Sequence, residues 1–190
     1  MMLNYLLSDN IPLMFTTKSK LITGTNAVLN CIMSLFTSCM FYFNDTEQNK
    51  NILFYCGTSY YIWDLFRIVI TKDKKNYFYI YHHYVTILML ESINLNYQSH
   101  MLNELFLLGE LSNISYHTVS SLLKFKNKKE VIVKRARSVQ IFTHLLLRLI
   151  IPAFYLKRVF NLDNRILSYN LLNMYIMGFV WMYKLIKSYI

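Results

Sequence analysis

The sequence predicts an all-α fold, an integral membrane bundle of about six transmembrane helices around a polar, lipid-accessible cavity. The first observation behind this prediction is composition: 55% of the 190 residues are apolar types and 16% are charged, against about 25% charged in typical soluble domains. The second is that Lys and Arg cluster between long apolar stretches. With only 4 Gly, 2 Pro and 3 Cys, the chain is neither a disordered tail nor a disulfide scaffold.

Six stretches have the length of about 20 mostly apolar residues that a bilayer-spanning helix needs. They are residues 21–43, 51–70, 77–97, 101–123, 138–156 and 166–187. The apolar N-terminal segment is interrupted by Asp9, Asn10 and Pro12. We therefore expect residues 1–20 to form a cytoplasmic or interfacial arm, and residues 21–190 to form one transmembrane domain.

The distribution of basic residues predicts the orientation of such a bundle. The connections on one side of six spans carry 14 Lys and Arg, and those on the other side carry four. Seven of them lie in the fourth connection, between Lys124 and Arg137. Because cytoplasmic loops are rich in Lys and Arg, both termini are expected in the cytoplasm. The net charge of +10 is thus explained by membrane loops, and no nucleic-acid partner is expected.

Ionisable side chains inside the expected spans are candidate functional residues, because charges within a bilayer are costly. Four of the ten carboxylates, Asp64, Glu91, Glu104 and Glu110, fall there, and all five histidines lie in or beside a span. Placing these groups around a shared interior would allow them to be paired or hydrated. A polar cavity between the helices is the expected solution.

Helical spacing places several of these side chains on common faces. Glu110, Asn113 and His117 follow the i, i+3, i+7 pattern, and His144 and Arg148 are four residues apart. Each face alone is equally well explained by hydrogen bonds between helices. Several such faces together favour a shared polar cavity, with Asn113, His117, His144 and Arg148 as candidate binding residues.

The pair His82 and His83 is the most specific feature of the sequence. Adjacent residues of a helix diverge by about 100°, so one ring is expected to face the cavity while the other packs against or bonds a neighbour. The chain has no HExxH-like pair of histidines four residues apart on one helix, and no metal is expected. The alternative interpretation is an interfacial belt of Tyr and His, since tyrosines surround the pair.

Four short motifs resemble those of the TLC-domain family, which includes ceramide synthases and the translocon-associated TRAM proteins. The motifs are Tyr60-Tyr61-Ile62-Trp63-Asp64-Leu65, His82-His83-Tyr84-Val85-Thr86, Gly109-Glu110-Leu111-Ser112-Asn113 and Leu147-Arg148-Leu149. The resemblance extends from about Leu21 to the C-terminus. It implies a six-helix bundle around a lipid-accessible cavity, usually in the endoplasmic reticulum.

The resemblance also implies roles for individual residues. His82 and His83 match the histidine pair that ceramide synthases associate with acyl transfer from acyl-CoA to a long-chain base. Glu110 and Asn113 fall where those enzymes have the two Asp residues of a His-Asp motif, and Gly109 replaces the His of that motif. A Glu-x-Ser sequence at this point is similar to the non-synthase members, which are linked to phospholipid composition and lipid trafficking.

Two functions are consistent with these observations. The first is lipid homeostasis, affecting sphingolipid or phospholipid composition, in which the polar interior binds a headgroup. The second is an acyl-CoA-dependent acyltransferase in which His82, His83, Asp64 and Glu110 are catalytic and acyl-CoA is a co-substrate rather than a bound cofactor. The expected partners are membrane lipids, namely acyl chains with a sphingoid base or a phospholipid, and a homodimer is left open.

Overall fold

The computed structural model describes residues 17–70, 77–123 and 130–189, and every regular element in these ranges is a helix. The all-α part of the predicted fold class is therefore confirmed. The elements are α2 (Thr17–Phe43), α3 (Glu47–Ile70), α4 (Tyr77–Asn94), α5 (Ser99–Leu122), α6 (Glu130–His144), the π-helical segment η3 (Leu145–Ile150), α7 (Ile151–Ala153), α8 (Leu156–Phe160) and α9 (Arg165–Tyr189). Most of the arm predicted for residues 1–20 lies outside the described residues.

Each of the six predicted stretches falls in helical structure, but two details of the fifth were wrong. The connection predicted for residues 124–137 is already helical from Glu130, where a polar first turn is stabilised by the Lys134–Glu130 pair at 2.8 Å. Hydropathy does not detect such a turn. The stretch 138–156 is also not one regular helix, since it passes into η3 and then α7. Pro152, which has no backbone N–H to donate, lies directly after the π-helical turns.

No helix in the described ranges combines the length and the apolar character by which a membrane span is identified. Membrane crossing by these helices therefore stays a prediction.

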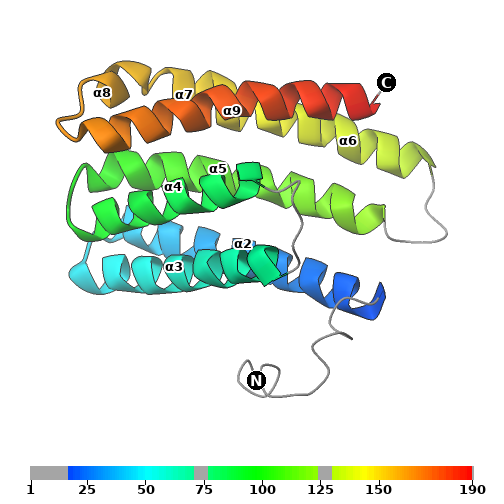
Figure 1. The fold of residues 1–190 in the computed structure, drawn as a ribbon, viewed down its shortest axis with the longest axis horizontal. Coiled ribbons are helices and arrows are strands. Elements are labelled where there is room, and N and C mark those ends of the chain that lie inside the picture. Colours follow the sequence, from blue (N-terminus) through cyan, green and yellow to red (C-terminus); the bar gives the residue numbers. More distant parts are fainter. Residues whose placement is uncertain (1–16, 71–76, 124–129, 190) are drawn as a thin grey trace.

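The helices form three stacked layers of two (Figure 1). α2 and α3 form the first layer, α4 and α5 the middle one, and α6 with η3 lies beside α9 in the third. Because α4 contacts α3, α5 and α9, and α5 contacts α2, α4 and α6, the middle pair belongs to two four-helix groups. The apolar core joins all three layers and includes Phe41, Leu53, Leu90, Leu102 and Leu167.

Two glycines let neighbouring helices approach closely. A Cβ on Gly57 of α3 would lie 2.7 Å from Cδ1 of Leu90 in α4, and Leu90 is completely buried. A Cβ on Gly178 of α9 would lie 2.9 Å from Cδ2 of Leu149 in η3. The second contact brings α9 against the π-helical segment and so helps to shape the space between the middle and third layers.

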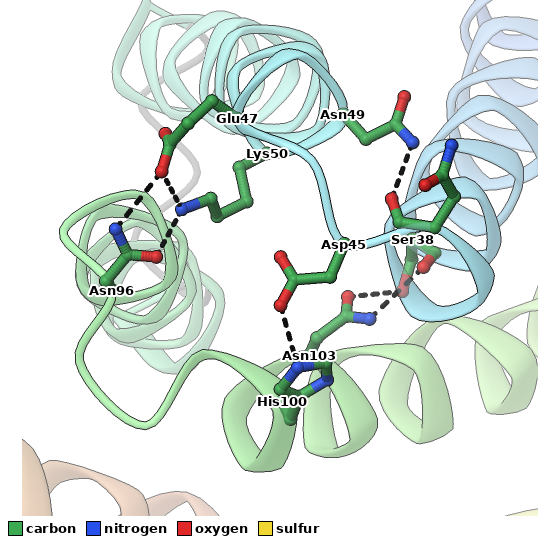
Figure 2. Close-up of polar contacts among 9 residues, drawn as sticks. Ser38, Asp45, Glu47, Asn49, Lys50, Asn96, His100 and Asn103 are labelled. Carbon is green, nitrogen blue, oxygen red and sulfur yellow. Dashed lines mark hydrogen bonds and ion pairs between the residues drawn. The ribbon is translucent and has the colours of Figure 1, made fainter.

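Polar side chains join the turns at one end of the first four helices (Figure 2). Lys50, only 3% exposed, donates hydrogen bonds to Glu47 at 2.5 Å and to Asn96, whose amide also donates to Glu47 at 3.3 Å. Asn96 lies in the turn between α4 and α5 with a φ of 60°, a left-handed conformation that Asn tolerates better than most residues. Asp45 and His100 form a second link of 2.8 Å between the same two turns. The first two layers are thus fastened together at this end.

The Glu47 contacts predict a pH-dependent contribution to stability. Hydrogen bonds from Lys50 and Asn96 lower the pKa of Glu47 below the ordinary glutamate value of 4.5. A carboxylate with a lowered folded-state pKa stabilises the fold above its unfolded pKa, and this contribution is lost as the pH falls through the folded value. Glu47→Gln should therefore lower the thermal unfolding midpoint at pH 7, and the difference from wild type should shrink below about pH 4.5. Asp163→Asn, at an exposed carboxylate between α8 and α9, is the control, and a pH-independent difference for Glu47→Gln would contradict the prediction.

Candidate functional site

A cavity of about 110 Å³ lies between the middle and third layers, with one wall residue, Tyr61, from α3. Three of its lining residues carry ionisable groups that the sequence singled out, namely His82, Glu110 and Arg148. The rest of the wall is mostly apolar and includes Met89, Leu105, Phe106, Leu147, Pro152, Leu156, Val159, Leu171 and Met174. The cavity is therefore amphipathic, with polar groups set in a hydrocarbon wall.

Glu110 is the buried acid of this site, with 3% of its surface exposed. The Tyr61 hydroxyl donates a hydrogen bond to its Oε1, and Nδ2 of Asn113 donates to the same oxygen at 3.3 Å. Tyr61 is itself 2% exposed. Sequence analysis did not identify it as a site residue, although its spacing of three from Asp64 places both on one side of α3.

Arg148 connects η3 to α5 through three hydrogen bonds. Its Nε donates to Ser112 Oγ at 2.5 Å, and Nη2 donates to Asn113 Oδ1 at 2.7 Å and to the Gly109 carbonyl at 3.2 Å. Asn113 therefore lies between the cation and the acid, accepting from Arg148 and donating to Glu110. The structure thus joins three residues that the sequence had placed on two separate faces.

Trp181 of α9 contacts both Arg148 and His82 through its indole ring. The guanidinium carbon of Arg148 lies 5.3 Å from the centre of its ring, which is a favourable cation–π distance. The His82 ring meets the same indole edge-on, at 5.4 Å and 88° between planes. The contribution of Trp181 depends on the fold, because the sequence gives no indication of which helix faces η3.

The two adjacent histidines point to different surroundings. His82 lines the cavity, and its Nδ1 lies 3.4 Å from Sδ of Met174. His83 is 5% exposed, and its Nε2 bonds Oδ2 of Asp64 at 2.7 Å. The ring of Tyr61 lies beside both imidazoles, and its centre is 6.4 Å from the centre of the His82 ring and 5.1 Å from that of the His83 ring. His82 thus belongs to the cavity, whereas His83 and Asp64 form a buried pair beside Tyr61.

Of the four predicted headgroup-binding residues, only Arg148 is among the lining residues of this cavity, whereas Asn113, His117 and His144 are not. His144 is buried, and its Nε2 lies 3.1 Å from the Gly178 carbonyl, so that it joins α6 to α9. His117 is half-buried on α5, beside the ring of Tyr116 at 5.5 Å. In the described part of the chain, no three His, Cys, Asp or Glu side chains are grouped closely enough to hold a metal ion.

Three ionisable side chains of different chemistry line the cavity. They are the imidazole of His82, the carboxyl group of Glu110 and the guanidinium of Arg148. Together they offer a proton acceptor or donor, a carboxyl oxygen and cationic donors beside an apolar wall. A molecule with a polar head and a hydrocarbon part matches this combination, and the imidazole is suited to proton transfer at the head.

Comparison with known proteins gives one match. The family model of the TLC domain, TRAM_LAG1_CLN8, matches residues 2–187, nearly the whole chain. No curated protein matches the chain, and no solved structure does.

Proposed function

Because the chain belongs to the TLC-domain family, as the match over residues 2–187 shows, we propose that it is a multi-pass membrane protein of lipid homeostasis. In this proposal, the protein adjusts sphingolipid or phospholipid composition through the polar site of His82, Glu110 and Arg148. The observation that carries it is the amphipathic cavity, in which the ionisable groups of these three residues lie beside hydrocarbon side chains. Most soluble metabolites would leave that apolar wall without a partner.

The outer surface supports placement in a bilayer. Large apolar side chains are exposed along the long helices, including Phe36 at 59%, Ile62 at 54%, Phe142 at 62% and Phe179 at 52%. Exposed apolar side chains in such numbers, on α2, α3, α6 and α9, support an interface with another apolar phase. From the asymmetric distribution of Lys and Arg, we propose that both termini lie in the cytoplasm. Membership of the TLC-domain family supports the further proposal that the protein lies in the endoplasmic reticulum or a related endomembrane.

A second candidate function is acyl transfer from acyl-CoA, and the position of His82 favours it. An imidazole that lines a cavity with polar and apolar walls is suited to take the proton of an attacking amine or hydroxyl. The acyl carbon would then form a bond to that nucleophile while the CoA thiolate leaves. His83, whose Nε2 is bonded to Asp64, would position the helix and Tyr61 rather than touch the substrate.

Lipidomics on cells producing matched membrane levels of the wild type, His82→Ala or His100→Ala tests both candidates. His100 is the control because it is an exposed histidine at the start of α5, is paired with Asp45 and is not among the lining residues of the cavity. We expect the wild type and His100→Ala to change one lipid class. If His82 is a catalytic base, His82→Ala should reduce that change by a factor on the order of 10²–10⁴.

The remaining outcomes separate the alternatives. A lipid change that persists in His82→Ala excludes acyl transfer by this imidazole and favours lipid binding or organisation. If the wild type leaves every lipid class unchanged, the proposed role in lipid homeostasis is wrong.

A further inference from the structure

The start of α6 and the end of α9 lie at the same end of the bundle (Figure 1), and both segments are rich in Lys and Arg. The two helices are joined there, since Nη1 of Arg137 donates to the Ser188 carbonyl at 2.6 Å. We call this group the basic end, and it consists of Lys134, Arg135, Arg137, Lys184 and Lys187. All but Arg137 are exposed. Five cations on two touching helix ends produce a positive field that no single helix would give.

Few negative charges oppose that field. Glu130 is the one carboxylate in α6, and α9 has none. Glu130 is paired with Lys134 in a solvent-exposed i, i+4 contact, the kind of ion pair that contributes little and is readily exchanged for another anion. The opposite end of the bundle carries both signs of charge. Lys157 and Arg158 of α8 lie there together with the carboxylates of Asp45, Glu47 and Asp163. The two ends therefore differ in charge.

Apolar side chains are exposed among the cations of the basic end. Val131 is 60% exposed and Ile132 49% on α6, and Tyr183 is 66% exposed and Ile186 42% on α9. Nζ of Lys184 lies 4.9 Å from the ring centre of Phe78, so that the first turn of α4 belongs to the same surface. Cations interleaved with apolar and aromatic side chains are typical of protein surfaces at the headgroup level of an anionic membrane.

From these observations we propose that the basic end binds the headgroups of anionic phospholipids. The phosphates pair with Lys134, Arg135, Lys184 and Lys187, while Val131, Ile132 and Tyr183 contact the upper part of the acyl chains. A soluble acidic partner would leave these apolar side chains without a matching surface, which is why lipid is the favoured occupant. The proposal rests on the membrane placement proposed above and on no property of the cavity.

The chain contains its own matched control for this proposal. Lys134-Arg135 and Lys157-Arg158 are the same dipeptide, exposed on helices at opposite ends of the bundle. Lys134→Gln/Arg135→Gln and Lys157→Gln/Arg158→Gln therefore remove the same charge and the same side chains. Because all four residues are exposed, both double variants are expected to fold, which equal unfolding midpoints without added lipid would verify.

The experiment titrates phosphatidylserine or phosphatidylcholine into the full chain purified in a zwitterionic detergent. The rise of the unfolding midpoint with lipid gives an apparent affinity. We expect a saturating rise with phosphatidylserine and none with phosphatidylcholine. The affinity for phosphatidylserine should fall about 5-fold for each cation removed, so about 25-fold in Lys134→Gln/Arg135→Gln, and stay unchanged in Lys157→Gln/Arg158→Gln.

Three results would overturn the proposal. The two lipids could act equally, the two double variants could lose affinity equally, or a polyglutamate peptide could raise the midpoint as much as phosphatidylserine does. None of them bears on the lipidomics of His82→Ala, so the proposed function and this surface fail or succeed separately.

Discussion

Replacing Arg148 with methionine should lower the free energy of unfolding by about 3–5 kcal/mol, measured by denaturation in detergent micelles. The guanidinium donates to Ser112, Asn113 and Gly109, and Asn113 in turn donates to Glu110. Methionine keeps most of the side-chain volume and removes every donor. The acceptors on Ser112, Asn113 and Gly109 would then lose their charged donor, and the buried Glu110 would lose the nearby positive charge.

Companion variants separate the charge of Arg148 from its shape. Arg148→Met/Glu110→Gln should recover part of the loss, because the acid that balances the cation is removed as well. Arg148→Lys should fall between wild type and methionine, since an ammonium cannot reproduce the planar set of donors. Arg158→Met at an exposed site should change stability by less than about 0.5 kcal/mol. No recovery in the double variant would mean that Glu110 is not the balancing charge.

The Asp64–His83 pair should show a coupling of about 1.5–3 kcal/mol in a double-mutant cycle of Asp64→Ala and His83→Ala. Their side chains are 16% and 7% exposed, and the bond between them is 2.7 Å. Nδ1 of His83 is buried and has no hydrogen-bond partner in the described ranges. Nε2 is therefore the ring nitrogen that forms a hydrogen bond there, and its partner is Asp64. Asp64→Ala therefore leaves the buried imidazole without this hydrogen bond, and the double variant removes the imidazole as well.

The measurement is again the free energy of unfolding, for the wild type, both single variants and the double variant. Cys56→Ala, at an exposed site on the same helix as Asp64, controls for substitution on α3. Additive effects of the two substitutions, within about 0.5 kcal/mol, would show that the pair contributes no stabilising interaction beyond its separate surroundings.

The helices were predictable because their length and apolar character are local properties of the sequence. The divergence of His82 and His83 was predictable for the same reason, as it follows from the angle between adjacent helical residues. Spacing along one helix also placed Glu110 and Asn113 on a common face. It could not show where that face meets the cavity, which is why His117, two turns further along, lies outside it.

Features that depend on contacts between helices could not be predicted. Trp181 approaches Arg148 only because Gly178 lets α9 pack closely against η3. The Tyr61–Glu110 hydrogen bond joins residues 49 positions apart. His144 was expected at a headgroup site, yet its imidazole bonds the backbone of α9, a contact that no spacing within α6 indicates.

The layered arrangement has a consequence for assembly during synthesis. The first two layers are helical hairpins of consecutive helices, α2 with α3 and α4 with α5, so each can form soon after its second helix emerges from the ribosome. The cavity, however, takes one wall from η3 to α8 and another from α9, the last of the described helices. Until α9 docks, His82 and Glu110 remain open on one side. Among the described helices, the candidate site is therefore the part of the fold whose walls are completed last during synthesis.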